Sequence, residues 1–225
     1  LMRVEKEPAR PAGGGLSFED VSLLGAGGVP LLDHVSFDVP RGEILAVAGV
    51  QGNGQTELAE VILGLRSPDS GVIRLENADI TRAKPRQSLD AGVGFIPEDR
   101  STDGIIASFS IADNLVLDQF RSSAFASFGS LKRGAIARNA RDKEAEYDIR
   151  LTSIGDPVSS LSGGNQQKVV VAREMSRDLT LLVANQPTRG VDVGSIEFIH
   201  RRIVDVRDQG CAVLLISSEL DEVVS

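Results

Sequence analysis

The sequence contains little cysteine, few aromatic residues and no long apolar run. Among its 225 residues there are one cysteine, one tyrosine and no tryptophan. A single cysteine excludes an internal disulfide and suits a reducing compartment, and its place in the run CAVLLIS predicts that Cys211 is buried in a strand. No apolar stretch approaches the roughly 18 to 20 residues that cross a bilayer, so we expect any membrane role to be peripheral or through a partner.

Positive charge is also scarce. The chain has 24 Lys and Arg residues against 32 Asp and Glu residues, which gives a net charge of −8 and a pI of about 4.9. This balance argues against a protein whose main role is to bind nucleic acid, although it allows a local site for a small polyanion. The histidines His34 and His200 have no neighbours of metal-ligand type, so we interpret both as structural or surface residues.

The first residues differ in composition from the rest of the chain. LMRVEKEPARPAGGG is charged and then rich in proline and glycine, so residues 1–15 are expected to form a linker or tail. Residues 16–225 are expected to form one α/β domain. Because the sequence starts without methionine and stops at Ser225 directly after an apolar run, we expect a fragment that is truncated at its C-terminal end.

The apolar pattern predicts an α/β fold with a parallel sheet. SFEDVSLL and LLDHVSFDV have the pattern of antiparallel strands, and EILAVAGV has that of a strand covered on both faces. LTLLVAN and CAVLLIS are two further buried strands, and IEFIHRRIVDVRD between them is a crossover helix, which makes the sheet parallel. Two amphipathic faces are expected on helices: Leu58, Val61, Ile62 and Leu65 on TELAEVILGL, and Ile196, Ile199, Ile203 and Val206 on the crossover helix.

The middle of the chain has no strong strand. SIADNLVLDQF and KRGAIARNARDKEAEYDIR both have helical patterns, so residues from about 98 to 171 are expected to form a helical subdomain. The core of the domain would then consist of residues 16–97 and 172–225.

A glycine loop joins the strand EILAVAGV to the following helix. In GVQGNGQTEL, Gly49 and Gly54 have the GxxxxG spacing and Gly52 adds freedom between them. Backbone N–H groups of such a loop and the positive end of the helix can hold a phosphate, and the hydroxyl of Thr56 stands where it would bind Mg²⁺. Gln55 occupies the position of the usual lysine, so this stretch alone is also compatible with a simple strand-to-helix turn.

A second anion-binding pattern follows more than a hundred positions later. LSGGNQQK, from Leu161 to Lys168, places two glycines before a helix. Here the chain resembles the ATPase domain of ABC transporters, whose signature sequence is LSGGQ. LLVANQPTRGVDVGSIEFIH is similar to the Walker B strand and D-loop of that family, GVGFIPEDR to its Q-loop and LLISSELDEV to its switch strand.

The resemblance extends from about Leu16 to the end of the chain and implies a P-loop NTPase fold. Its parts would be a RecA-like core with a parallel sheet, a small antiparallel β subdomain and a helical subdomain that carries the signature. LSGGNQQK, PEDR and PTRGVDVGSIEFIH look like the second, C-terminal ATPase domain of tandem proteins that serve simple-sugar and nucleoside importers.

The resemblance also identifies where this sequence departs from the family. The lysine, the Mg²⁺-binding aspartate, the catalytic glutamate, the switch histidine and the Q-loop glutamine are replaced, in that order, by Gln55, Asn185, Gln186, Ser218 and Glu98. The first four of these replacements are neutral, which removes charge and the ability to take a proton. We therefore expect the domain's own site to bind ATP and Mg²⁺ weakly, with Thr56 and Asn185 as metal ligands, and to hydrolyse ATP very slowly.

The remaining nucleotide-binding residues are implied by the resemblance on two surfaces. The phosphate loop would contribute Gly49, Gly52, Asn53, Gly54, Gln55, Thr56 and Glu57. The intact signature would complete the ATP site of a partner domain with Ser162, Gly163, Gly164, Asn165 and the D-loop residue Asp192.

The implied partners are a second ABC ATPase domain, expected in the N-terminal half of the same protein, and the transmembrane subunits of a permease. A solute-binding protein would take part only indirectly, no nucleic acid is expected, and the domain would lie at the cytoplasmic side of the membrane. FSIADNLVL could contact the permease or belong to the core of the helical subdomain. Two other functions remain open at this stage, a non-transport ATPase of the ABC class and a regulatory nucleotide-binding dimerisation module.

Overall fold

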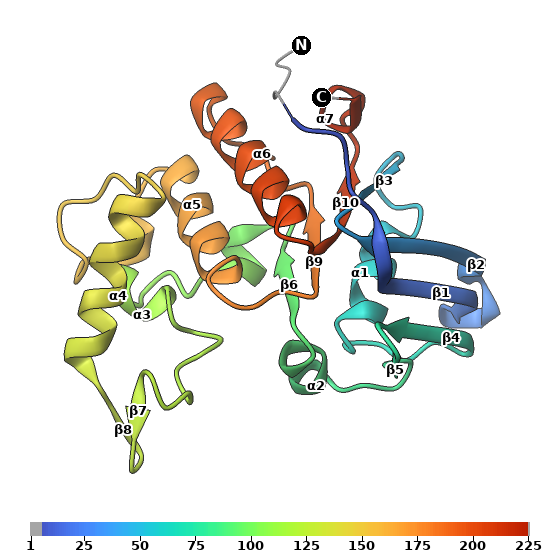
Figure 1. The fold of residues 1–225 in the computed structure, drawn as a ribbon, viewed down its shortest axis with the longest axis horizontal. Helices are drawn as coiled ribbons and strands as arrows, with labels where there is room; N and C mark the ends of the chain where they lie inside the picture. The colour runs from blue at the N-terminus through green and yellow to red at the C-terminus, as the bar shows by residue number, and fades with distance from the viewer. Residues whose placement is uncertain (1–5, 225) are drawn as a thin grey trace. The chain divides into compact units, whose positions relative to one another are not determined.

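The computed structural model describes residues 6–224, which pack into two compact units (Figure 1). The first unit comprises the chain up to Phe95, the segment Asp178–Gln186 and the chain from His200 onward. The second comprises Ile96–Arg177 and Pro187–Ile199. The beginning of the expected linker, residues 1–5, lies outside the described residues. Among the residues that are described, no helix has the length and apolar character needed to cross a membrane.

An antiparallel sheet forms one part of the first unit (Figure 1). Its strand order is β2-β1-β4-β5, with β1 (Ala12–Leu24), β2 (Pro30–Arg41), β4 (Ser70–Leu75) and β5 (Ala78–Asp79). Phe18 of β1 is opposite Phe37 of β2, and their rings stack with centroids 4.7 Å apart. The two antiparallel strands predicted for the N-terminal region are therefore confirmed, and a single turn of 3₁₀-helix, η1 (Ala26–Gly28), connects them.

Strand β1 begins earlier than the sequence pattern suggested. Residues 12–15, which were expected in the linker, already belong to it. Gly15 has a φ of 102° beside an irregular step in the register, and its carbonyl accepts the N–H of Glu76 at 2.7 Å. Glycines can adopt such a bulged strand conformation. A glycine-rich composition alone therefore does not distinguish a bulged strand from a flexible linker.

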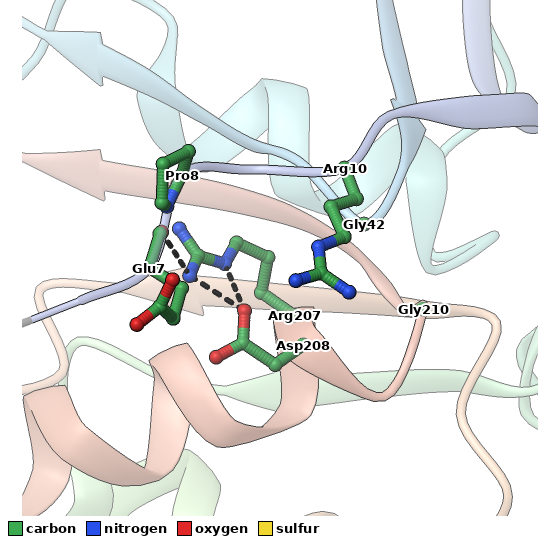
Figure 2. A pocket seen from close by; sticks show the side chains of 7 residues that line it. All are labelled: Glu7, Pro8, Arg10, Gly42, Arg207, Asp208 and Gly210. Carbon is green, nitrogen blue, oxygen red and sulfur yellow. Dashed lines mark hydrogen bonds and ion pairs between the residues drawn. The ribbon is translucent and has the colours of Figure 1, made fainter.

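The residues before β1 also contact the first unit. Figure 2 shows the side chain of Arg207 in contact with the N-terminal segment, where its Nη2 donates to the carbonyl oxygen of Glu7 at 3.0 Å. Its Nε donates to Oδ1 of the next residue, Asp208, at 2.8 Å. A small cavity of about 220 Å³ lies here, lined by Glu7, Pro8, Arg10, Gly42, Arg207, Asp208 and Gly210. The end of the predicted linker is therefore held against the domain by a buried arginine.

A second sheet in the first unit has the order β3-β10-β9-β6. It consists of β3 (Ile44–Ala48), β6 (Val93–Ile96), β9 (Leu181–Asn185) and β10 (Ala212–Ser217), and β10 pairs with both β3 and β9 in parallel. The predicted parallel sheet is thus confirmed. Strands β9 and β10 are buried along their whole length, but β3 is only partly buried. The expectation that β3 is covered on both faces was only partly right. Leu45 and Val47 pack against the core of the first unit, whereas Ile44 and Ala46 line a surface pocket.

The helices of the first unit follow the predicted apolar pattern with one exception. Helix α1 (Gln55–Ile62) buries Leu58, Val61 and Ile62, while α2 (Pro85–Asp90) and α7 (Leu220–Val224) are short. Leu65 was expected on the buried face of α1 but is 61% exposed. The helix ends at Ile62, and Gly64 with a φ of 72° then turns the chain away from the helical direction.

Helix α6 (Val193–Asp208) connects β9 to β10 as the crossover helix that was predicted. Ile199, Ile203 and Val206 are buried and Ile196 is half-buried, in agreement with the expected apolar face. A crossover helix of this kind is how two neighbouring parallel strands of one sheet are normally joined.

The second unit is mainly helical. It contains α3 (Ile111–Asn114), α4 (Arg133–Glu146) and α5 (Gly163–Glu174), a π-helical turn η2 (Arg100–Gly104), a 3₁₀ turn η3 (Val158–Ser160) and the small hairpin β7 (Ala126–Ser127) and β8 (Ser130–Leu131). The helix predicted for SIADNLVLDQF was wrong beyond Asn114. The fully buried side chain of Asn114 donates to three backbone carbonyls of the preceding loop and accepts from Ile106 N at 2.9 Å, so local side-chain bonds fix the loop before α3.

Candidate functional site

Three neighbouring parallel strands end at the same edge of their sheet. In the register, Ala48 at the end of β3 lies opposite Ser217 of β10, and Asn185 at the end of β9 lies opposite Ile216. The glycine loop, Gln186 and Ser218 follow directly after these strand ends. Ligands of open parallel sheets bind beyond the carboxyl ends of the strands, so the first unit brings four of the predicted site positions to a place that suits ligand binding.

The glycine loop has the geometry of a strand–loop–helix anion site. Gly52 and Gly54 adopt φ angles of 91° and 95°, and Gly49 donates its N–H to the carbonyl of Ser217 at 3.3 Å. A Cβ atom at Gly54 would lie 2.7 Å from the carbonyl oxygen of Leu31, so only glycine fits there. Helix α1 starts at the next residue, and the N–H groups of its first turn have no partner within the helix.

The side chain of Gln55 folds back onto this loop. Its Nε2 donates to the carbonyl oxygen of Val50 at 2.9 Å, and its Oε1 accepts the backbone N–H of Asn53 at 2.9 Å. The side chain of Asn53 donates to the same Val50 oxygen at 2.9 Å. The residue in the lysine position is therefore bonded within the loop at both ends of its carboxamide.

The other three positions at this edge are neutral as well. Ser218 donates its hydroxyl to Gln186 Oε1 at 3.2 Å, which links the residues in the histidine and glutamate positions. Gln186 has a φ of 46°, a conformation that is unusual for a glutamine and typical of functional sites, and its N–H donates to the carbonyl of Ile216 at 2.7 Å. Neither Gln186 nor Ser218 can take up a proton at neutral pH.

Oxygen atoms suitable for Mg²⁺ are present, but they carry no charge. Asn185 is only 4% exposed, and its Oδ1 is buried without a hydrogen-bond partner among the described residues. The exposed Thr56 adds a hydroxyl in the first turn of α1, next to the half-buried Glu57. No group of three or more His, Cys, Asp or Glu side chains that could hold a metal occurs in residues 6–224. Neutral oxygens can coordinate Mg²⁺, so each of these two side chains has the chemistry of a weak ligand.

The signature sequence lies in the second unit at the start of α5. Ser162 caps the helix, and its Oγ accepts the side-chain amide of Asn165 at 3.0 Å. Gly163 and Gly164 form the first turn of α5 instead of preceding it, as the sequence pattern had suggested. Asn165 also accepts the backbone N–H of Arg150 at 2.8 Å, so its side chain is engaged within the second unit.

The D-loop residue Asp192 packs against this signature. Its carboxylate accepts the N–H and the hydroxyl of Ser195 at 3.1 and 2.8 Å, which caps helix α6 and lowers the pKa of Asp192 below its ordinary value. A Cβ atom at Gly164 would lie 2.5 Å from Asp192 Oδ2 and 2.6 Å from Ser195 Oγ. The second signature glycine is therefore required by the close approach of the two helix starts.

Glu98 also belongs to the second unit, where it forms an ion pair with Arg189. Arg100 donates to the carbonyls of Arg189 and Gly190 at 3.0 and 3.4 Å, and its Nη2 would lie 2.5 Å from a Cβ atom at Gly163. Sequence reasoning did not identify either arginine as a site residue, although both stand in the PEDR and PTRG sequences that carried the resemblance. The predicted site residues thus form two groups, one in each unit.

Comparisons with known proteins identify the family of the chain. The family model described as ABC transporter matches residues 32–189. The nucleoside import ATP-binding protein NupA of Lactococcus lactis subsp. cremoris is 44% identical over 221 residues, which is 98% of this chain and 44% of NupA. The guanosine import ATP-binding protein NupO of Bacillus subtilis is 40% identical over 223 residues, which is 99% of this chain and 44% of NupO. The chain therefore spans less than half the length of these curated relatives.

Solved structures of ATP-binding cassettes have the same fold. A dimeric cassette in a post-hydrolysis state, bound to ADP and Pi, matches with a TM-score of 0.77 and 19% identity over 92% of this chain and 89% of the other. A nucleotide-free cassette from an ABC transporter matches with a TM-score of 0.75 and 22% identity over 94% of this chain and 84% of the other. At these identities the likeness supports the fold alone.

Proposed function

The chain belongs to the ABC transporter family of ATP-binding domains, and we propose that it is one half of the ATPase motor of a nucleoside or simple-sugar importer. Its fold is that of a P-loop ABC ATPase. The import function is supported by the names of its relatives, which include nucleoside, guanosine, glucose and ribose import ATP-binding proteins.

The chain's own nucleotide site is hydrolysis-impaired in this proposal. The observation that supports it is the hydrogen bond between Ser218 and Gln186. These two neutral side chains occupy the positions of the family's histidine and glutamate. A hydrogen bond to a charged group contributes roughly 1.5–3 kcal/mol, so the absence of the lysine weakens nucleotide binding by about 10- to 100-fold. Removing one group that stabilises the transition state typically costs a further factor of about 10² to 10³ in rate.

Nucleotide binding at this site would rest on the glycine loop and the start of α1. The loop presents Gly52, Asn53 and Gly54, and the first turn of α1 presents the N–H groups of Gln55 and Thr56. Mg²⁺ would be held by Thr56 and Asn185 and would neutralise phosphate charge. Glu57 in the same turn stabilises the helix but opposes a phosphate by its negative charge.

In this proposal, the signature surface is the part of the domain that contributes to ATP hydrolysis. The exposed Ser162 and the first turn of α5 would complete the ATP site of a second ABC ATPase domain, together with Asp192. That domain would supply the lysine, aspartate and glutamate that this chain lacks. We assign it to the N-terminal half of the same tandem protein, which is consistent with the length of the relatives.

A groove in the second unit is a suitable contact for the transmembrane subunits of a permease. Its volume is about 570 Å³ and it is lined mainly by apolar side chains, namely Ile106, Phe109, Val116, Leu117, Phe120 and Leu131. Phe109 and Phe120 are 46% and 43% exposed, whereas Ile111 and Leu115 of the same stretch are buried. FSIADNLVL thus contributes both to the core and to an exposed apolar surface, and binding there would place the domain peripherally at the cytoplasmic side of the membrane.

A titration and a turnover assay on the same sample test the asymmetric site. Mg-ATP is titrated calorimetrically into the chain, and phosphate release is then measured at saturating ATP. We expect weak binding and no measurable turnover. As a matched control, a variant with Gln55→Lys, Asn185→Asp, Gln186→Glu and Ser218→His is expected to bind ATP at least about 10-fold more tightly. Turnover of about 1 s⁻¹ by the natural sequence would contradict the proposal.

A further inference from the structure

We infer that Gln55 occupies the anion position of its own phosphate loop, so that nucleotide can bind this site only after the Gln55 side chain has moved out. The inference rests on the proposed function, because it concerns nucleotide access to the impaired site. It differs from a simple loss of charge, since it assigns to Gln55 an active role in keeping phosphate out.

Both ends of the Gln55 carboxamide are bonded to the loop backbone. The Oε1 atom accepts the N–H of Asn53 at 2.9 Å, as a phosphate oxygen would, and Nε2 donates to the carbonyl of Val50 at 2.9 Å. A Cβ atom at Gly49 would lie 2.7 Å from Nε2, so the absence of a side chain at Gly49 leaves room for the amide. We call this pair of bonds the Gln55 bridge.

A lysine could not form the same bridge. An ammonium group has three donors and no acceptor, so it could bond to the carbonyl of Val50 but would leave the N–H of Asn53 for an anion. Glutamine has both an acceptor and a donor, and it satisfies the loop without any ligand. The replacement at position 55 therefore removes a positive charge and also one of the loop's anion donors.

This inference and the simpler alternative predict opposite effects of one substitution. If Gln55 merely donates a weak hydrogen bond to phosphate, removing its amide weakens anion binding. If Gln55 forms the bridge, removing its amide frees the N–H of Asn53 and strengthens anion binding. Gln55→Met separates the two, because methionine is of similar length and has no amide with which to form either bond of the bridge.

The experiment measures the affinity of the chain for inorganic pyrophosphate and for Mg-ATP by calorimetry. We expect Gln55→Met to bind pyrophosphate about 2- to 10-fold more tightly than the natural sequence, which is the range for one released hydrogen bond. Gln55→Lys is expected to bind more tightly still. Leu65→Gln, at an exposed position beyond α1, serves as the control and should leave the affinity unchanged. Equal or weaker binding by Gln55→Met would overturn the inference.

A second measurement does not depend on any ligand. Amide hydrogen exchange of the nucleotide-free chain should show the N–H of Asn53 protected in the natural sequence and in Leu65→Gln, and unprotected in Gln55→Met. If neither the natural sequence nor Gln55→Met binds pyrophosphate detectably, the amide exchange of Asn53 tests the inference. An unprotected N–H of Asn53 in the natural sequence then refutes the Gln55 bridge. ATP turnover by the natural sequence would instead refute the impaired site, so the two failures are distinguishable.

Discussion

The single cysteine illustrates how burial controls chemistry at the scale of one residue. Cys211 is 3% exposed, and burial raises the pKa of its thiol to about 12. The thiolate is the reactive form of cysteine, so almost none is present at neutral pH in the folded chain.

We therefore predict that Cys211 does not react with iodoacetamide or a disulfide reagent until the chain unfolds. In native buffer its labelling rate should follow the rate of global unfolding, and in denaturant it should approach that of a free cysteine. A Ser67→Cys variant provides the control, because position 67 is exposed and should be labelled at once. Labelling of Cys211 at the rate of Cys introduced at position 67 would contradict the predicted burial.

The candidate site residues could be named from the sequence, but their contacts could not. The spacing between a strand and a helix indicated Gln55, whereas the resemblance to ABC ATPases indicated Asn185, Gln186 and Ser218. The structure places all four at the carboxyl ends of parallel strands. The bonds of Gln55 to its own loop depend on one side-chain rotamer and one backbone turn, which no spacing specifies. Arg100 and Arg189 were missed for a related reason, because their partners are backbone carbonyls and a carboxylate from segments about 90 residues apart in the sequence.

At the scale of elements, strand and helix identity followed the apolar periodicity, whereas burial and length did not. The run in β3 predicted a strand correctly, but an apolar run does not tell whether both faces of the strand are covered, and one face of β3 borders a surface pocket. The helix expected over SIADNLVLDQF ends at Asn114, whose buried amide bonds to the loop before the helix. Neither the cover on one face of a strand nor the end of a short helix is specified by the apolar period.

The start of α5 offers a test at this scale, because its two glycines face different neighbours. A Cβ atom at Gly164 would lie 2.5 Å from Asp192 Oδ2, whereas at Gly163 it would meet the end of the flexible Arg100 side chain. We predict that Gly164→Ala lowers the free energy of unfolding by about 1–3 kcal/mol, the usual range for overpacking.

Gly163→Ala is the matched control for that substitution. Alanine favours a helix by up to about 1 kcal/mol over glycine, and Arg100 can move aside, so this variant should be neutral or slightly more stable. Urea unfolding of both variants measures the difference. Equal stability of the two variants would show that the signature does not pack closely on Asp192.

At the scale of the whole molecule, the chain has its two groups of site residues in two compact units. The phosphate loop with its neutral neighbours belongs to the first unit, and the signature, Asp192 and Glu98 belong to the second. The division of the sequence into a core and a helical insertion of about 98–171 stays a prediction. Residues 187–199 pack with the second unit although they follow a core strand, and no local pattern in the sequence indicates this.

If the two units have the proposed roles, substitutions in them should have unequal effects on the ATP turnover of a partner domain. The chain is mixed with an ABC ATPase domain that retains the lysine, aspartate and glutamate, and ATP turnover of the mixture is measured. The natural chain should stimulate turnover. Ser162→Arg, which places bulk at the exposed cap of the signature helix, should abolish the stimulation, while Gln186→Ala should change it less than about 3-fold because a neutral amide contributes no catalytic base. Urea unfolding establishes that both variants are folded. If Gln186→Ala abolished stimulation and Ser162→Arg did not, hydrolysis would take place at this chain's own site. The proposed roles of the two ATP sites would then be contradicted.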